Sequence, residues 1–338
     1  MRLPFAVRKC KISRNITKYQ KLSRNNAIRP IPMTQIYPPA SATVQPPITG
    51  KTQVLAVIGN PIGHSLSPLM HNAALAALGL DYVYLAFPIA AENLGAALEG
   101  FAAIGLVGFN ITIPHKQAIL PLLQSVTPLA EAVGAVNTVW RTETGWSGTN
   151  TDVLGFLAPL KTPATDWSQR AALVLGNGGA ARAVVAGLLE LGCPHITIAG
   201  RNPQRLAQFL ASWSPAFLAR FPHASLVACP WDALATALPS AGLVVNTTPL
   251  GMAPQIDRSP LTPAEVEQLP TGAIVYDLIY TPSPTQLLAQ AQGRGLRAID
   301  GLEMLVQQGA EALRIWTDRQ DVPVEMMRHR LQTHLGLL

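Results

Sequence analysis

Polar side chains gather in two short stretches of the sequence, each at the end of a predicted element. In NITIPHK, Asn110 and Thr112 are two residues apart, so a strand would carry both on one side, and Lys116 follows at a predicted helix start. In GNPIGHSLSP, Ser65 and Ser67 precede a helix whose N-terminal N–H groups could hold an anion such as a carboxylate. Ser67 is expected to be the N-cap of that helix, whereas Ser65 has no expected structural role. A solvated lysine is the ordinary alternative for Lys116.

A glycine-rich turn provides a second kind of chemistry. Residues 171–182 read AALVLGNGGAAR, an apolar strand that runs through a G-x-G-x-x-A turn into a helix. Gly176 permits the tight turn, Gly178 lets the backbone approach a pyrophosphate, and Ala181 permits close packing of helix on strand. Backbone N–H groups at the helix start would then face a diphosphate. The motif predicts a dinucleotide site.

The residues after the next strand indicate which dinucleotide binds. A site that prefers NAD usually has an acidic residue there, to accept a hydrogen bond from the ribose 2′-hydroxyl. This sequence has GRNPQR instead, with Arg201, Asn202 and Arg205 and no acid. Guanidinium groups suit a 2′-phosphate, and cations at a helix N-terminus are otherwise unfavourable. The pattern favours NADP over NAD.

These side chains are expected on an α/β framework. The apolar pattern predicts a first series of strands and helices, with strands at residues 53–59, 82–89, 106–112 and 137–141 and helices at 67–79, 94–104 and 152–160. After a loop at 161–170, a second series alternates with helices and has strands at 172–175, 195–199, 243–247 and 273–277. Such alternation implies parallel sheets. Two successive helices, 301–317 and 322–335, end the chain.

Composition excludes several classes of protein. Of 338 residues, 49% are hydrophobic and 13% charged, which is enough apolar material for a large core and excludes a disordered chain. No uninterrupted apolar run is long enough for a membrane span. Three scattered cysteines and seven histidines without ligand spacing predict neither disulfides nor a metal site. A reducing, cytoplasmic location is expected.

The net charge of +6 belongs to the N-terminal segment. Residues 1–30 hold nine of the 25 basic side chains and the first acidic residue is Asp81, so residues 31–338 have 16 basic and 19 acidic side chains. The high pI therefore predicts no nucleic-acid partner. Residues 1–50 are expected to be a disordered basic extension ending in a linker rich in proline, serine and threonine; a targeting presequence is the alternative, and Met33 a possible start.

Eight motifs, in this order and spacing, resemble the shikimate dehydrogenase family over residues 53–335. They are GNPIGHSLSP, NITIPHK, GAVNTV, NTD, GNGGAAR, NTTPLGM, YDLIY and DGLEMLVQQ. The resemblance implies reversible NADPH-dependent reduction of 3-dehydroshikimate to shikimate, by hydride transfer to C3, in the shikimate pathway of aromatic amino-acid biosynthesis. It implies a substrate domain at 51–152, a Rossmann-like NADP domain at 153–300, and C-terminal helices at 301–338 that return to the substrate domain. A monomer or homodimer acting on small molecules is expected.

The resemblance also assigns roles to residues. Lys116 and Asp152 correspond to the catalytic acid–base pair, and which of them takes the proton stays open. The substrate residues are Ser65, Ser67, Asn110, Thr112, Asn137, Tyr280 and Gln308. The cofactor residues are Gly176, Gly178, Gly179, Ala180, Arg201, Asn202, Arg205, Thr247, Leu278 and Gly301. Gln308 also stands out by position, because its amide falls on the apolar stripe of a helix, where it needs a polar partner or a ligand.

Two departures and two alternatives accompany this reading. Gly200 stands where many family members have asparagine, and Glu303 where glycine is frequent. A quinate/shikimate dehydrogenase of broader specificity is one alternative, and a non-catalytic NADP-binding regulator is the other. Retention of both serines, both arginines, Lys116 and Asp152 favours the NADP-dependent shikimate enzyme.

Overall fold

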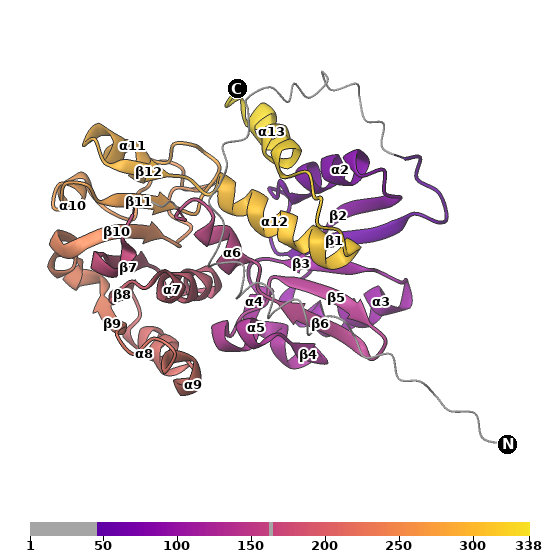
Figure 1. Cartoon of the computed structure of the whole chain (residues 1–338), viewed down its shortest axis with the longest axis horizontal. Coiled ribbons are helices and arrows are strands. Elements are labelled where there is room, and N and C mark those ends of the chain that lie inside the picture. The colour runs from indigo at the N-terminus through magenta and orange to yellow at the C-terminus, as the bar shows by residue number, and fades with distance from the viewer. Residues whose placement is uncertain (1–45, 162–164) are drawn as a thin grey trace. The chain divides into compact units, whose positions relative to one another are not determined.

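Two six-stranded β-sheets organise the chain. The computed structural model describes residues 46–161 and 165–338 (Figure 1). The expectations for the basic extension and for most of the linker concern residues outside these ranges. Among the residues described, no helix is long and apolar enough to cross a membrane.

The first sheet has the order β2-β1-β3-β5-β6-β4. Its strands are β1 (Gln53–Gly59), β2 (Tyr82–Pro88), β3 (Gly108–Ile111), β4 (Ser125–Val126), β5 (Thr138–Thr142) and β6 (Gly145–Thr149). The expected parallel pairing holds for β1 with β2 and β3, but β5 is antiparallel to both β3 and β6. The β5–β6 pairing has a local reason: only residues 143–144 separate the two strands, and a connection that short can join only antiparallel strands.

The second sheet is parallel throughout, as predicted, with the order β12-β11-β10-β7-β8-β9. Its strands are β7 (Ala171–Leu175), β8 (His195–Gly200), β9 (Ser225–Pro230), β10 (Ala241–Asn246), β11 (Ile274–Asp277) and β12 (Arg297–Ile299). The sequence pattern missed β9 and β12 because both are edge strands with exposed residues, and β12 has only three residues. The strand order reverses at β7 and β10, a point where parallel sheets commonly bind ligands.

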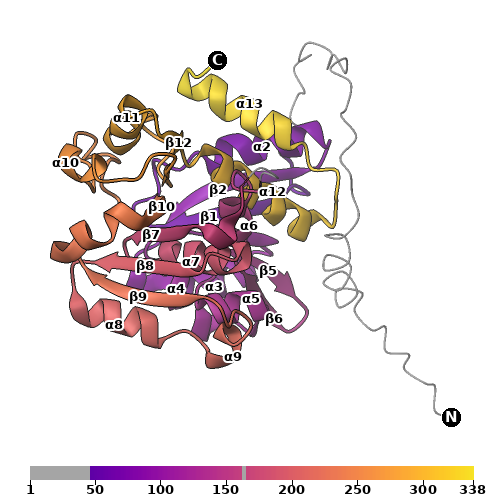
Figure 2. The same ribbon diagram turned by 60° about the vertical axis from the view of Figure 1, so that its left-hand side comes forward.

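The helices connect these strands and cover the sheets (Figures 1 and 2). They are α2 (Ser67–Ala77), α3 (Leu94–Ala103), α4 (His115–Ala118), α5 (Pro128–Val133), α6 (Asp152–Leu157), α7 (Gly179–Leu191), α8 (Pro203–Ala211), α9 (Pro215–Leu218), α10 (Pro263–Val266), α11 (Gln286–Gly293), α12 (Leu302–Thr317) and α13 (Val324–Leu335). Figure 2 shows α8 beside β9 at one edge of the second sheet.

The last two helices return to the first sheet. Val306 and Leu313 of α12 share a buried core with Leu55 of β1, Met70 of α2 and Tyr84 of β2. Helix α13 packs on α2 (Figure 1). Burial of this apolar face explains why residues more than 200 positions apart in sequence meet.

A close contact between the Trp316 side chain and the backbone of β3 and β5 holds α12 against the first sheet. Trp316 donates its indole N–H to the Val139 carbonyl at 2.9 Å, and its ring lies directly over Gly108 of β3. A Cβ atom at Gly108 would be 2.2 Å from Trp316 Nε1 and 2.7 Å from the Val139 oxygen. The sheet therefore requires glycine at this position.

We predict that Gly108→Ala lowers the free energy of unfolding by about 1–3 kcal/mol, because the added methyl overpacks a rigid contact. Urea unfolding followed by tryptophan fluorescence measures this change. Gly100→Ala is the matched control, since a Cβ there meets nothing within 4 Å and alanine favours a helix. Equal stability of the two variants would contradict the proposed contact.

Candidate functional site

Lys116 and Asp152 form a nearly buried ion pair. Lys116 lies in α4 just after β3, and Asp152 is the first residue of α6 just after β6. Lys116 Nζ donates to Asp152 Oδ2 at 2.6 Å, and the two side chains are 16% and 6% exposed. Little water competes for either charge, so each orients the other.

Asn137 holds the other oxygen of this carboxylate. Its Nδ2 donates to Asp152 Oδ1 at 2.8 Å and lies 3.3 Å from Gln308 Oε1 of α12. Its Oδ1 accepts from the Thr151 N–H at 2.7 Å, which fixes the amide orientation. The Gln308 amide, which was expected to need a polar partner or a ligand, therefore has two partners in the protein. Its Oε1 lies near Asn137, and its Nε2 donates to the Leu305 carbonyl at 2.8 Å.

A second branch of hydrogen bonds begins at Asn110. Antiparallel register places Asn110 opposite Thr138, and Asn110 Nδ2 donates to Thr138 Oγ1 at 3.0 Å. Asn110 Oδ1 accepts from the Tyr84 phenol at 2.7 Å. Burial raises the pKa of Tyr84, while a hydrogen bond from Ser67 opposes this shift. Sequence reasoning missed Tyr84, although the hydroxyl of a tyrosine in a buried strand needs a partner.

The start of α2 corrects one prediction. Ser67 is the first helical residue and not the N-cap; Leu66 occupies the cap position, and no side chain caps the helix. Ser65 does have a structural role, because its Oγ accepts from the Ser67 N–H at 3.3 Å. The Tyr280 phenol reaches this loop through a hydrogen bond with the Leu66 backbone.

The hydrogen bonds described above link eight of the nine predicted catalytic and substrate residues, directly or through Tyr84 and Leu66. Thr112 follows β3 two residues after Asn110, but its side chain is not linked in this way. Its methyl group lies beside Gly59, and within the described residues no hydrogen bond joins its side chain to the others.

The glycine-rich turn lies at the switch point of the second sheet. Gly176 has φ +106°, which favours glycine, and a Cβ there would be 2.6 Å from Thr247 Oγ1 after β10. A Cβ at Gly179, the first residue of α7, would lie 3.5 Å from Lys116 Cβ. The turn therefore meets the ion pair at the start of α7.

Leu278 and Gly301 occupy the segments beyond β11 and β12. A Cβ at Gly301 would be 2.0 Å from the Leu278 carbonyl oxygen, so these two predicted cofactor residues are in direct contact. Gly301 also donates its N–H to the Ile279 carbonyl at 3.1 Å.

Two free guanidinium groups stand at the start of α8. Arg201 and Arg205 are exposed, and neither has a carboxylate partner in the described part of the chain. Asn202 is the N-cap of α8, since its Oδ1 accepts from the Arg205 N–H at 3.0 Å. Cations at a helix N-terminus need an anion, so this end of the second sheet suits a phosphate.

Glu303, one of the two departures, has a structural partner. Its carboxylate accepts two hydrogen bonds of 2.7 Å from Arg328 of α13. Burial would raise the pKa of Glu303, but hydrogen bonds from Arg328 and Gln307 outweigh it and lower the pKa. Glu303 joins α12 to α13, and among the described residues its carboxylate forms no hydrogen bond with Lys116, Asp152 or Asn137.

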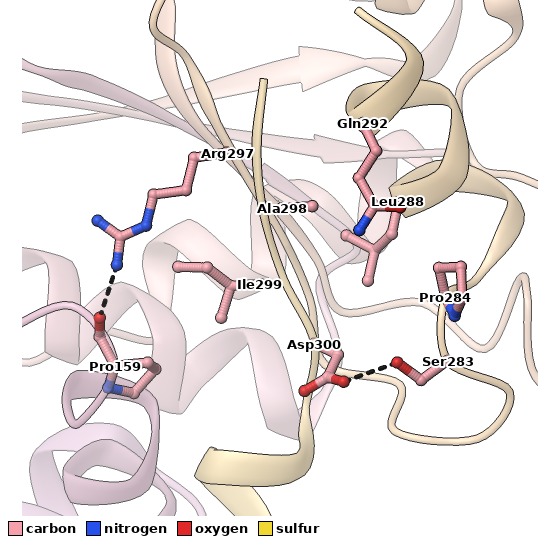
Figure 3. A pocket seen from close by; sticks show the side chains of 9 residues that line it. All are labelled: Pro159, Ser283, Pro284, Leu288, Gln292, Arg297, Ala298, Ile299 and Asp300. Atoms are coloured by element: carbon pink, nitrogen blue, oxygen red, sulfur yellow. Dashed lines mark hydrogen bonds between the residues drawn. The ribbon is translucent and has the colours of Figure 1, made fainter. Parts of the chain in front are cut away.

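A hollow of about 390 Å³ lies elsewhere, along the β12 edge of the second sheet. Arg297 donates to the Pro159 carbonyl at 3.3 Å and Ser283 donates to Asp300 at 2.7 Å. Figure 3 draws both hydrogen bonds among the residues that line the hollow. None of the predicted site residues lines it.

A glycine-rich turn at the switch point of a parallel sheet, beside a lysine–aspartate pair on a second sheet, defines a dinucleotide-dependent α/β oxidoreductase. Comparison with known families narrows this class. Residues 57–139 match the model of the shikimate dehydrogenase substrate binding domain, and residues 301–332 match that of the shikimate 5′-dehydrogenase C-terminal domain.

Individual relatives agree. The chain is 60% identical to shikimate dehydrogenase (NADP(+)) of Trichormus variabilis, over 86% of this chain and all of the relative. Shikimate 5-dehydrogenase of Thermus thermophilus, solved in complex with NADP(H) and shikimate, has a TM-score of 0.70 and 37% identity, covering 83% of this chain and 99% of the other. The Listeria monocytogenes enzyme, solved with shikimate and NAD, has a TM-score of 0.75 and 33% identity, covering 86% and 99%. The chain belongs to the shikimate dehydrogenase family.

His71 predicts a specific pH dependence of stability. The His71 ring stacks on the Tyr84 ring, with the two ring centroids 4.2 Å apart. Burial lowers the pKa of His71 from 6.5 to about 3. Between these values the unfolded chain binds a proton that the folded protein excludes, so stability falls as pH falls below 6.5, by at most about 5 kcal/mol.

We predict that His71→Phe, which keeps a stacked ring, flattens this part of the profile between pH 6.5 and 4. Urea unfolding of both proteins across this range measures the difference. Burial raises the pKa of Asp277 to about 6, so this group also contributes to the pH dependence of stability in this range. Its contribution is the same in both proteins and cancels when the two profiles are subtracted. Parallel profiles for the two proteins would refute the assignment.

Proposed function

We propose that this chain catalyses the reversible NADPH-dependent reduction of 3-dehydroshikimate to shikimate, in the shikimate pathway, with Lys116 and Asp152 as its acid–base pair. The observation that carries the proposal is the 2.6 Å ion pair, with the glycine-rich turn beside Lys116. Its similarity to relatives named shikimate dehydrogenase (NADP(+)) supports the substrate and the cofactor.

The substrate is a small ring acid with several hydroxyl groups, and the polar network suits it. We assign the carboxylate to Ser65 and Ser67 at the start of α2 and to Tyr280 beside them, because Leu66 at the cap position supplies no side-chain acceptor for the helix. We assign the ring hydroxyls to Asn110, Thr112, Asn137 and Gln308. A pocket built from such groups rejects ligands that leave its hydrogen bonds unmade.

The residues of the second sheet fit NADP. The unpaired guanidinium groups of Arg201 and Arg205 suit the 2′-phosphate, with Asn202 contributing the N–H₂ that its capping role leaves free. The turn Gly176, Gly178, Gly179 and Ala180 would hold the diphosphate with backbone N–H groups. Thr247, Leu278 and Gly301 would line the nicotinamide end.

Bound NADPH supplies the hydride for C3 of the substrate. As the C3 carbonyl oxygen becomes negative, the Lys116 ammonium stabilises it and donates a proton. Asp152 orients Nζ through Oδ2, while Asn137 holds Oδ1 and prevents the carboxylate from turning away. In the oxidation direction the pair accepts the hydroxyl proton as one unit.

We assign the parts of the chain accordingly. Residues 51–152 bind the substrate, 153–300 bind NADP, and 301–338 return to contribute Gln308. The packing of α12 and α13 on the core of the first sheet supports this division. We further propose that the enzyme acts in the cytoplasm and that it is a monomer or a homodimer. Light scattering of the purified chain measures its molar mass and so tests the oligomeric state.

We predict that Lys116→Ala lowers kcat with shikimate and NADP by about 10²–10⁴-fold, because it removes the proton donor. Absorbance of the reduced nicotinamide measures the rate, and tryptophan fluorescence measures NADP affinity, which is expected to be unchanged. Lys51→Ala, an exposed lysine outside the network, is the control.

The same assay tests substrate and cofactor choice, with shikimate and quinate each offered with NADP and with NAD. Turnover of shikimate with NADP, with the other combinations at least about tenfold slower, is the expected result. Comparable rates with quinate or NAD would favour the broader quinate/shikimate dehydrogenase. Binding of NADP without any turnover would favour the regulator.

A further inference from the structure

Asn177 is the second residue of the glycine-rich turn, and its position is fixed by the neighbouring backbone. Gly176 donates its N–H to the Ala199 carbonyl at 2.9 Å, which ties the turn to the end of β8. Gly178 follows as the N-cap residue of α7. Asn177 therefore belongs to the turn and lies beside the end of β8, next to the segment that carries Arg201.

The side-chain amide of Asn177 lacks a partner in the described structure. Its Nδ2 is buried and makes no hydrogen bond to the described residues. A buried amide without a partner destabilises the folded chain. Because most buried polar groups in proteins are paired, such an amide within a ligand site points to the ligand as its partner.

Gly200 makes room for this side chain. A Cβ at Gly200 would be 3.3 Å from Asn177 Nδ2 and 3.4 Å from Asn177 Cγ, tighter than most contacts of a real Cβ. The Asn177 amide thus lies over the position where a side chain at residue 200 would begin. Position 200 is also where the sequence resemblance places asparagine in many family members.

The chemistry of NADP indicates what lies opposite this amide. The diphosphate and the 2′-phosphate are attached to the same adenosine ribose, so that ribose lies between the groups that bind them. Asn177 is part of the turn, and its amide lies against Gly200, the residue that precedes Arg201. A carboxamide N–H₂ can donate to a phosphate, which has only acceptors.

We propose that Asn177 is a specificity-determining residue for NADP, whose amide binds the 2′-phosphorylated adenosine ribose in the space that Gly200 leaves open. This inference rests on the proposed use of NADP. The competing role is steric: Asn177 fills the gap over Gly200 and touches no cofactor. A steric role would change the affinities for NADP and NAD by the same factor.

The experiment measures the dissociation constants of NADP and NAD by titration calorimetry, without turnover. Asn177→Ala should weaken NADP binding by about 10-fold, the loss of one hydrogen bond to a charged group, and NAD binding by less than about 3-fold. Equal factors for the two cofactors, or no change in either, would overturn the proposal.

A double-mutant cycle tests the shared space. Gly200→Asn alone should crowd the Asn177 amide and weaken binding of NADP, whereas Asn177→Ala with Gly200→Asn should restore most of the NADP preference. If the double variant prefers NADP over NAD no more than Asn177→Ala does, an asparagine at position 200 does not replace the Asn177 amide, and the proposal of a shared space is wrong. Asn93→Ala, an exposed asparagine in another part of the chain, is the control, and thermal unfolding verifies that each variant is folded.

The outcomes separate this inference from the proposed function. If the unaltered chain binds NADP and turns over shikimate while Asn177→Ala leaves the cofactor preference intact, only the role of Asn177 is wrong. If the unaltered chain binds neither cofactor, both proposals fail together.

Discussion

The nearly buried carboxylate of Asp152 is the constraint on which the first sheet depends. An ionised carboxylate so far from water destabilises the fold unless it is paired and hydrogen-bonded. Lys116 supplies the charge at 2.6 Å and Asn137 the hydrogen bond at 2.8 Å. Strands β3 and β6 must therefore end, and the antiparallel strand β5 must begin, at the same edge of the sheet. The proposed chemistry uses this same pair, so stability and activity share one requirement.

The end of the chain completes this arrangement. Gln308 of α12 contacts Asn137 from 171 residues away, and Trp316 of the same helix binds the Val139 carbonyl. Apolar burial brings α12 to the first sheet, and the hydrogen bonds then set its position along the sheet. The second sheet joins through a shared core in which Phe156 of α6 stacks on Tyr276 of β11.

Local patterns predicted elements well and partners poorly. The prediction of Ser67 as the N-cap of α2 was wrong, because the cap position depends on where the backbone first turns helical, and here that position is Leu66. A strand was predicted where β5 lies, but its antiparallel partner β6 was missed because the residues of β6, GWSGT, carry little apolar signal. Tyr84 was missed because its hydroxyl partner, Asn110, lies on another strand.

Local sequence patterns indicated most of the strands and helices, the glycine-rich turn after β7, and the basic, acid-free segment after β8, because each depends on neighbouring residues. Motif resemblance added the family. The contacts of Lys116 with Asp152, of Asn137 with Gln308 and of Asn177 with Gly200 are visible only in the folded chain. Those contacts join segments far apart in the chain, and their geometry follows from how helices pack on sheets, which no local spacing encodes.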